Sequence, residues 1–78
     1  MRDKLLDWFC KKGVNKKDII KKIKDNYMEL GYIDSLGFLE LISYCEDTFK
    51  ISFEDEDFED DAIFTIEGLI NIIKKRTK

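Results

Sequence analysis

An Asp-Ser pair in the sequence ELGYIDSLGFLELI, residues 29–42, is the clearest candidate for a chemical role in this chain. Asp34 and Ser35 follow a loop sequence that contains Gly31, and they precede an apolar stretch with helical periodicity. This order predicts that the pair lies at a helix N-terminus, where free backbone N–H groups donate to side-chain oxygens. A phosphodiester on Ser35 would meet the positive end of the helix there, although a charged Asp34 would partly oppose it.

Self-contained serine catalysis is a poor interpretation of this pair. The sequence has no histidine to act as a base for Ser35, and it has no G-x-S-x-G turn around that residue. An exposed serine beside a carboxylate is better suited to modification by another enzyme. On the dipeptide alone, a plain helix cap is the more frequent explanation, so function requires more than the pair itself.

The composition predicts one small soluble domain over residues 1–78. The chain is 44% hydrophobic, which is enough for one core, and a chain of 78 residues leaves little room for a deep active site. Cys10 and Cys45 lie far apart without CxxC spacing, so we expect reduced buried thiols and no zinc site. Charged residues follow Met1 directly and no apolar run is long enough to span a bilayer, which favours a cytoplasmic protein without membrane insertion.

Charge is distributed unevenly along the chain. Residues 34–64 contain one Lys against eleven Asp and Glu, whereas residues 1–33 contain nine Lys and Arg against five acidic residues. The acidic middle would steer basic partner surfaces toward it and repel nucleic acid. Its densest run, EDEDFEDD at residues 54–61, lacks the glycine and the ligand order of a calcium loop, so no metal site is expected.

Helix is the default expectation because the chain has no proline and only four glycines. A first helical stripe should end at Gly13, and Asn15 is a plausible N-cap for a short helix inside a long first connection. A central helix is predicted over about residues 35–49. The residues of its expected buried stripe are Phe38, Ile42, Cys45 and Phe49.

The second half of the chain predicts one more main helix. ISFEDEDFEDDAIF, residues 51–64, reads as a loop around a single short turn, with a strand as the competing interpretation of KISF at its start. Thr65 should cap the last helix, whose C-terminal lysines suit the negative end of the helix dipole. The predicted fold is therefore all-α, a small bundle of three main helices with one or two short ones and a long first loop.

The central region resembles the acyl carrier protein family. The resemblance is carried by DSL at residues 34–36, ELI at residues 40–42 and EDTF at residues 46–49. In that family the D-S-L serine carries 4'-phosphopantetheine and opens the second main helix. The spacing of Gly31 and Gly37 around the motif is closer to the D-alanyl and peptidyl carrier branch than to fatty-acid carriers.

The resemblance implies roles for individual residues. Ser35 corresponds to the modified serine, Asp34 to an aspartate that helps the transferase, and Leu36 to an apolar residue near the arm. Fatty-acid carriers have an acidic residue in place of Gly37 and more carboxylates on the helix that partners recognise. Partner docking here should therefore depend more on apolar contact than on ion pairs. The expected partner-binding residues are Phe38, Leu39, Glu40, Tyr44, Glu46 and Asp47.

Membership of this family would make the chain a carrier without catalytic activity of its own. Its expected partners are a phosphopantetheinyl transferase, an acyl- or aminoacyl-activating enzyme, and a downstream acyltransferase or synthase, with a monomer as the default state. The cargo would be held as a thioester on the arm. The alternative is an unmodified helical interaction module in which Asp34 and Ser35 form only an N-cap. Exposure of Ser35 at a helix start is required by the carrier interpretation alone.

Overall fold

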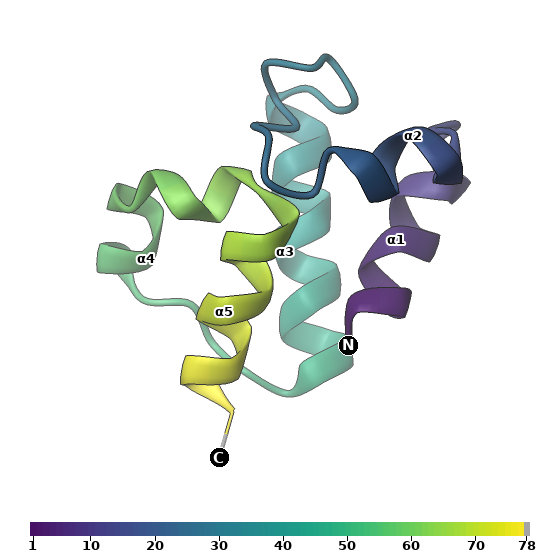
Figure 1. Cartoon of the computed structure of the whole chain (residues 1–78). Coiled ribbons are helices and arrows are strands. Elements are labelled where there is room, and N and C mark those ends of the chain that lie inside the picture. The colour runs from purple at the N-terminus through teal and green to yellow at the C-terminus, as the bar shows by residue number, and fades with distance from the viewer. Residues whose placement is uncertain (78) are drawn as a thin grey trace.

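The computed structural model describes residues 1–77, in which helices are the only regular secondary structure. The elements are α1 (Arg2–Lys11), α2 (Lys16–Lys21), α3 (Ser35–Phe49), α4 (Asp55–Glu59), the 3-10 helix η1 (Asp61–Phe64) and α5 (Ile66–Arg76). Figure 1 shows α3 running through the middle, with α1 and α2 to one side and α4, η1 and α5 to the other. The predicted all-α bundle, with three main helices and a long first connection, is confirmed.

Local capping signals place the helix boundaries where the sequence predicted them. The side chain of Asn15 accepts hydrogen bonds from the N–H groups of Lys17 and Asp18 at the start of α2. The hydroxyl of Thr65 accepts the N–H of Gly68 at 2.9 Å at the start of α5. After α1, the chain turns at Gly13 with φ +97°, a conformation that glycine adopts without strain.

The helices bury one apolar cluster, and α3 contributes to it over a wider arc than the sequence stripe predicted. Ile42 and Cys45 are buried as expected, but Leu41, outside the predicted stripe, is completely buried. Phe38 and Phe49 at the ends of the stripe are only half-buried. A central helix with neighbours on two sides packs more than one narrow face, which explains the difference. Cys10, expected to be buried, is also only partly covered.

The acidic segment after α3 contains more helix than predicted. It forms two helical pieces, α4 and η1, instead of one turn, and no strand forms in residues 50–54 of the described chain. Asp57 explains the extra order, because its carboxylate accepts the N–H of Glu54 at 2.8 Å and receives the guanidinium of Arg76 from α5. Asp57 is 3% exposed, so this ion pair joins α4 to α5 from inside.

The long first connection is fixed to the other half of the bundle. The N–H of Tyr27 donates to the carbonyl of Phe64 at 2.9 Å, and the Tyr27 hydroxyl donates to the carbonyl of Ile63. The N–H of Glu67 donates back to the carbonyl of Ile23. These bonds hold residues 23–27 against η1 and α5, so the loop that leads into α3 starts from a fixed point.

Within residues 1–77, no helix combines the length and the apolar character needed to cross a membrane.

Candidate functional site

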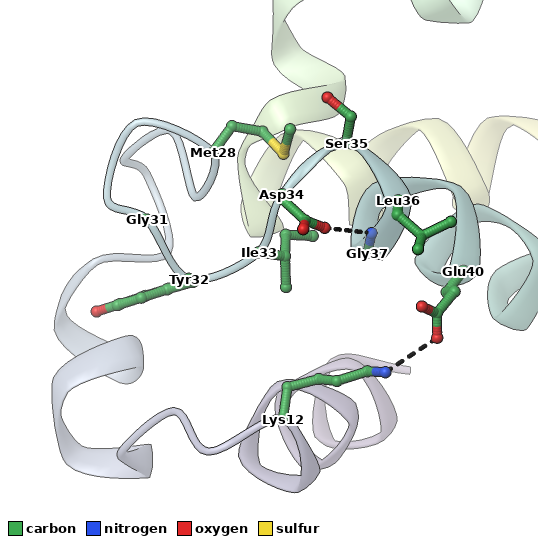
Figure 2. A pocket seen from close by; sticks show the side chains of 10 residues that line it. All are labelled: Lys12, Met28, Gly31, Tyr32, Ile33, Asp34, Ser35, Leu36, Gly37 and Glu40. Atoms are coloured by element: carbon green, nitrogen blue, oxygen red, sulfur yellow. Dashed lines mark hydrogen bonds and ion pairs between the residues drawn. The ribbon is translucent and has the colours of Figure 1, made fainter.

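Ser35 is the first residue of α3, and its side chain is exposed. Asp34 directly before it has extended backbone angles, and its carboxylate accepts the N–H of Gly37 at 2.8 Å. The predicted N-cap is therefore present. Figure 2 shows the Ser35 hydroxyl pointing outward while the Asp34 carboxylate turns back toward Gly37. The Asp34 side chain therefore caps the first turn of the helix, while the Ser35 side chain faces solvent.

The preceding loop holds this pair at the edge of the bundle. The side chain of Asn26 accepts the N–H groups of Met28 and Glu29, and Gly31 takes φ +77° to reverse the chain. Ile33, one residue before the cap, is buried with 9% of its surface exposed. Because Ile33 is anchored in the core, the next two residues are brought to the rim with little freedom to move inward.

A shallow cleft of about 700 Å³ lies next to Ser35, between the start of α3, the end of α1 and the loop at residues 28–33. Its lining combines apolar side chains with charged ones, as Figure 2 shows. The lining residues are Lys12, Met28, Gly31, Tyr32, Ile33, Asp34, Ser35, Leu36, Gly37 and Glu40. The cleft is an open groove beside an exposed hydroxyl and can accommodate a flexible group attached there.

One ion pair spans the cleft. The Nζ atom of Lys12, just after α1, lies 3.0 Å from Oε2 of Glu40 in the second turn of α3. The same ammonium group sits 5.2 Å from the centre of the Trp8 ring, within the range of a cation–π contact. Sequence reasoning missed Lys12 as a site residue, because a lysine after a helix is already explained by the helix dipole.

The structure separates the predicted partner-binding residues into two groups. Leu39 and Glu40 are exposed near Ser35, and Leu36 between them and the serine is 66% exposed. Asp47 is also exposed but belongs to the far end of α3. The cleft lining thus contains Asp34, Ser35, Leu36 and Glu40 from the sequence prediction.

The remaining three predicted partner-binding residues are half-buried and already engaged within the protein. Phe38 packs against Phe64 with ring centres 5.2 Å apart. The Tyr44 hydroxyl donates to the carbonyl of Lys4 at 3.4 Å, and the Glu46 carboxylate accepts the N–H of Phe53 at 3.0 Å. These side chains are less available to a docking enzyme than Leu36 and Leu39.

Other reactive groups in the chain lie away from this cleft. Burial, assisted by the charge of Glu46, raises the pKa of the Cys45 thiol to about 12, so this thiol stays protonated near neutral pH. In the part of the chain that the structure describes, no three Cys, Asp or Glu side chains are grouped so that they could hold a metal ion. The chemistry that the site itself offers is an exposed hydroxyl at the positive end of a helix.

Comparison with known proteins agrees with this geometry. Residues 3–73 match the family model described as a phosphopantetheine attachment site, which covers most of the chain. Neither the curated proteins nor the solved structures gave a match. The resemblance to acyl carrier proteins is therefore confirmed, and the chain belongs to the phosphopantetheine attachment site family, whose members carry 4'-phosphopantetheine covalently on a serine.

Proposed function

We propose that Ser35 is the serine that carries 4'-phosphopantetheine. The chain has three serines, at positions 35, 43 and 52. All three are exposed, but Ser43 lies in the middle of α3 and Ser52 in the connection before α4, whereas Ser35 stands at the N-terminus of α3 beside a carboxylate. This last observation carries the proposal, because a phosphodiester at that place is stabilised by the helix dipole and by nearby backbone N–H groups.

The loading step needs a separate enzyme. The Ser35 oxygen attacks the phosphorus of coenzyme A that bears the pantetheine. A new P–O bond to serine forms, the pyrophosphate P–O bond breaks, and adenosine bisphosphate leaves, while the serine proton passes to a base of the transferase. This chain contributes an exposed nucleophilic oxygen on a rigid helix end. The bound arm supplies a thiol for thioester chemistry, and the chain itself acts as a carrier and not as a catalyst.

The carried group is an acyl or aminoacyl thioester, loaded by an activating enzyme and passed to an acyltransferase or synthase. Two features support the D-alanyl or peptidyl carrier branch. Gly37 stands where fatty-acid carriers have an acidic residue, and α3 presents few free carboxylates near Ser35. The proposed unit is one carrier domain over residues 1–78 that acts as a monomer in the cytoplasm.

A second candidate function is an unmodified interaction module. The 2.8 Å bond from Gly37 N–H to Asp34 favours it, because a capping role alone would account for Asp34. It does not account for the family match over residues 3–73. One experiment distinguishes the two candidates.

The test is intact mass of the purified chain before and after incubation with coenzyme A, magnesium and a broad-specificity phosphopantetheinyl transferase. We expect a gain of one phosphopantetheine in the parent and none in Ser35→Ala. Ser43→Ala is the matched control, since it removes another exposed hydroxyl from the same helix and should load normally. A folded parent that stays unloaded with several transferases would overturn the proposal in favour of the interaction module.

A further inference from the structure

We propose that Lys12 determines which loading enzymes recognise this carrier. By pairing with Glu40, it cancels the acidic charge that directly follows Leu39 on α3. The neutral surface that results favours a transferase with an apolar, uncharged docking face over one with a basic face. The inference rests on the proposed attachment at Ser35. It adds a residue from outside α3 to the recognition surface of the carrier.

The geometry of the Lys12–Glu40 ion pair supports lasting neutralisation of the Glu40 charge. Lys12 and Glu40 are 28 positions apart in the chain, yet the folding of α1 against α3 brings their charged atoms to 3.0 Å. Their side chains are 37% and 51% exposed, a position that a docking enzyme can reach. An exposed pair alone is weakly held, but the Trp8 ring below the ammonium group, itself 9% exposed, adds a second contact that keeps Lys12 in place.

The other carboxylates on α3 and at its N-cap are also occupied or distant from Ser35. The Asp34 carboxylate accepts the N–H of Gly37, and its charge faces the positive end of the helix. Glu46 accepts the N–H of Phe53. Asp47 is free of such a bond among the described residues, but it belongs to the last turns of α3 while Ser35 belongs to the first. A basic surface that approaches Ser35 therefore meets no unopposed carboxylate on the first two turns of the helix.

Apolar surface remains for the enzyme to bind. Leu36 and Leu39 are 66% and 61% exposed, and they lie within the first five residues of α3, which begins at Ser35. An enzyme that brings its reactive groups to the serine oxygen must cover this part of the helix. Burial of two leucine side chains gives affinity without ion pairs, so docking should change little with salt. Figure 2 shows Leu36 and Glu40 on adjacent turns, with the Lys12 side chain extending toward Glu40 from the end of α1.

The test measures kcat/KM for transfer of phosphopantetheine to Ser35 by a transferase whose carrier-binding face is basic. Four proteins are compared: the parent, Lys12→Met, Glu40→Gln and the double variant. Lys74→Met is the matched control, because it removes one exposed lysine from α5, away from the cleft. Thermal unfolding followed by circular dichroism verifies that each variant is folded.

We expect Lys12→Met to raise kcat/KM at least about threefold at about 50 mM salt, and the gain to disappear at about 500 mM salt. The double variant should stay near the parent, because residues 12 and 40 are neutral in sum in both proteins, whereas Glu40→Gln should fall below the parent because it leaves the Lys12 ammonium group unpaired against a basic face. Lys74→Met should not reproduce the gain of Lys12→Met. Equal rates for Lys12→Met and the parent, with loading still dependent on Ser35, would overturn the inference alone. No loading of any folded variant, by this transferase or by several others, would overturn the proposed function and the inference with it.

Discussion

The Asp34 carboxylate closes the first turn of α3 by accepting the N–H of Gly37 at 2.8 Å, two residues beyond the exposed hydroxyl of Ser35. The residue that stabilises the helix end and the residue proposed to carry the arm are therefore different. The two can be tested separately. A substitution at position 34 can preserve the cap while removing the negative charge.

Asp34→Ser should separate the capping role from the carboxylate. Serine is an N-cap of similar strength, so Asp34→Ser should keep the free energy of unfolding within about 0.5 kcal/mol of the parent. Asp34→Ala should lose about 1 kcal/mol, because the N–H of Gly37 then has no side-chain partner. Urea denaturation followed by circular dichroism measures both values. If Asp34→Ser were as destabilised as Asp34→Ala, the carboxylate itself would be needed for the helix end.

Tyr27→Phe should destabilise the fold although it leaves the ring in place. The Tyr27 hydroxyl is buried with the ring and donates to the carbonyl of Ile63 in η1. Its loss leaves a buried carbonyl without that donor, at a cost of about 1–2 kcal/mol in urea denaturation. Tyr44→Phe is the matched control, since its hydroxyl makes a longer bond, 3.4 Å, in an exposed place. An equal decrease in the free energy of unfolding for the two variants would show that the hydrogen bond to Ile63 stabilises the fold no more than the bond of Tyr44 does.

Features set by neighbouring residues could be predicted from the sequence, whereas long-range pairs could not. The caps at Asn15, Asp34 and Thr65 depend on hydrogen bonds across two or three residues, so composition and spacing were sufficient to find them. The Ser35 motif belongs to this class too. Its place on the rim depends on the adjacent burial of Ile33.

The ion pairs belong to the other class. Lys12 and Glu40 are 28 positions apart, and Asp57 and Arg76 are 19 positions apart. Each of these four residues also has a local explanation as an exposed charge on a helix or loop, so the sequence contained no signal that favoured pairing. Packing decides between these explanations, which is why the extra order in α4 and the neutralised charge at Glu40 appeared only in the structure.

Gly68→Ala should be strongly destabilising because α5 and η1 approach each other closely at this position. A Cβ atom at residue 68 would lie 2.0 Å from the carbonyl oxygen of Ala62, which is backbone and cannot rotate away. We expect a loss of at least about 2 kcal/mol in urea denaturation, despite the better helix propensity of alanine. Asn71→Ala, exposed on the same helix, should be neutral or slightly stabilising. A stable Gly68→Ala variant would contradict this close packing.

The Asp57–Arg76 pair should make stability depend on acid pH. The hydrogen bond from the Arg76 guanidinium lowers the pKa of the Asp57 carboxyl below its ordinary value, so the folded state holds the charged form more strongly than the unfolded chain does. This contribution is complete above about pH 4, the ordinary range of an aspartate, and disappears as the pH falls below it through the folded pKa.

Thermal unfolding of Asp57→Asn between neutral pH and about pH 2 tests this dependence. The midpoint should be clearly lower than that of the parent at neutral pH, and the two curves should converge in acid. Glu56→Gln is the matched control, because Glu56 contacts the same guanidinium at 2.9 Å but is 67% exposed and should matter less. Parallel curves for Asp57→Asn and the parent over the whole range would exclude a role for this pair in acid stability.

The Cys45 thiol should be unreactive in the folded protein, so it should not attack the proposed thioester on the arm. Its thiol is completely buried, and burial raises its pKa to about 12, so almost no thiolate forms near neutral pH. In a Cys10→Ser variant, which leaves Cys45 as the only cysteine of the chain, a disulfide reagent should react about a thousandfold more slowly with the native protein than with the denatured protein.

After loading at Ser35, the same Cys10→Ser variant should show one fast-reacting thiol, that of the arm, while Cys45 stays protected. The cargo would then have no protein thiolate to which it could transfer within the same molecule. Spectrophotometric thiol titration before and after loading counts these groups directly. Fast labelling of the unloaded, folded variant would show that Cys45 is reached by opening of the core, and the thioester would then need another form of protection.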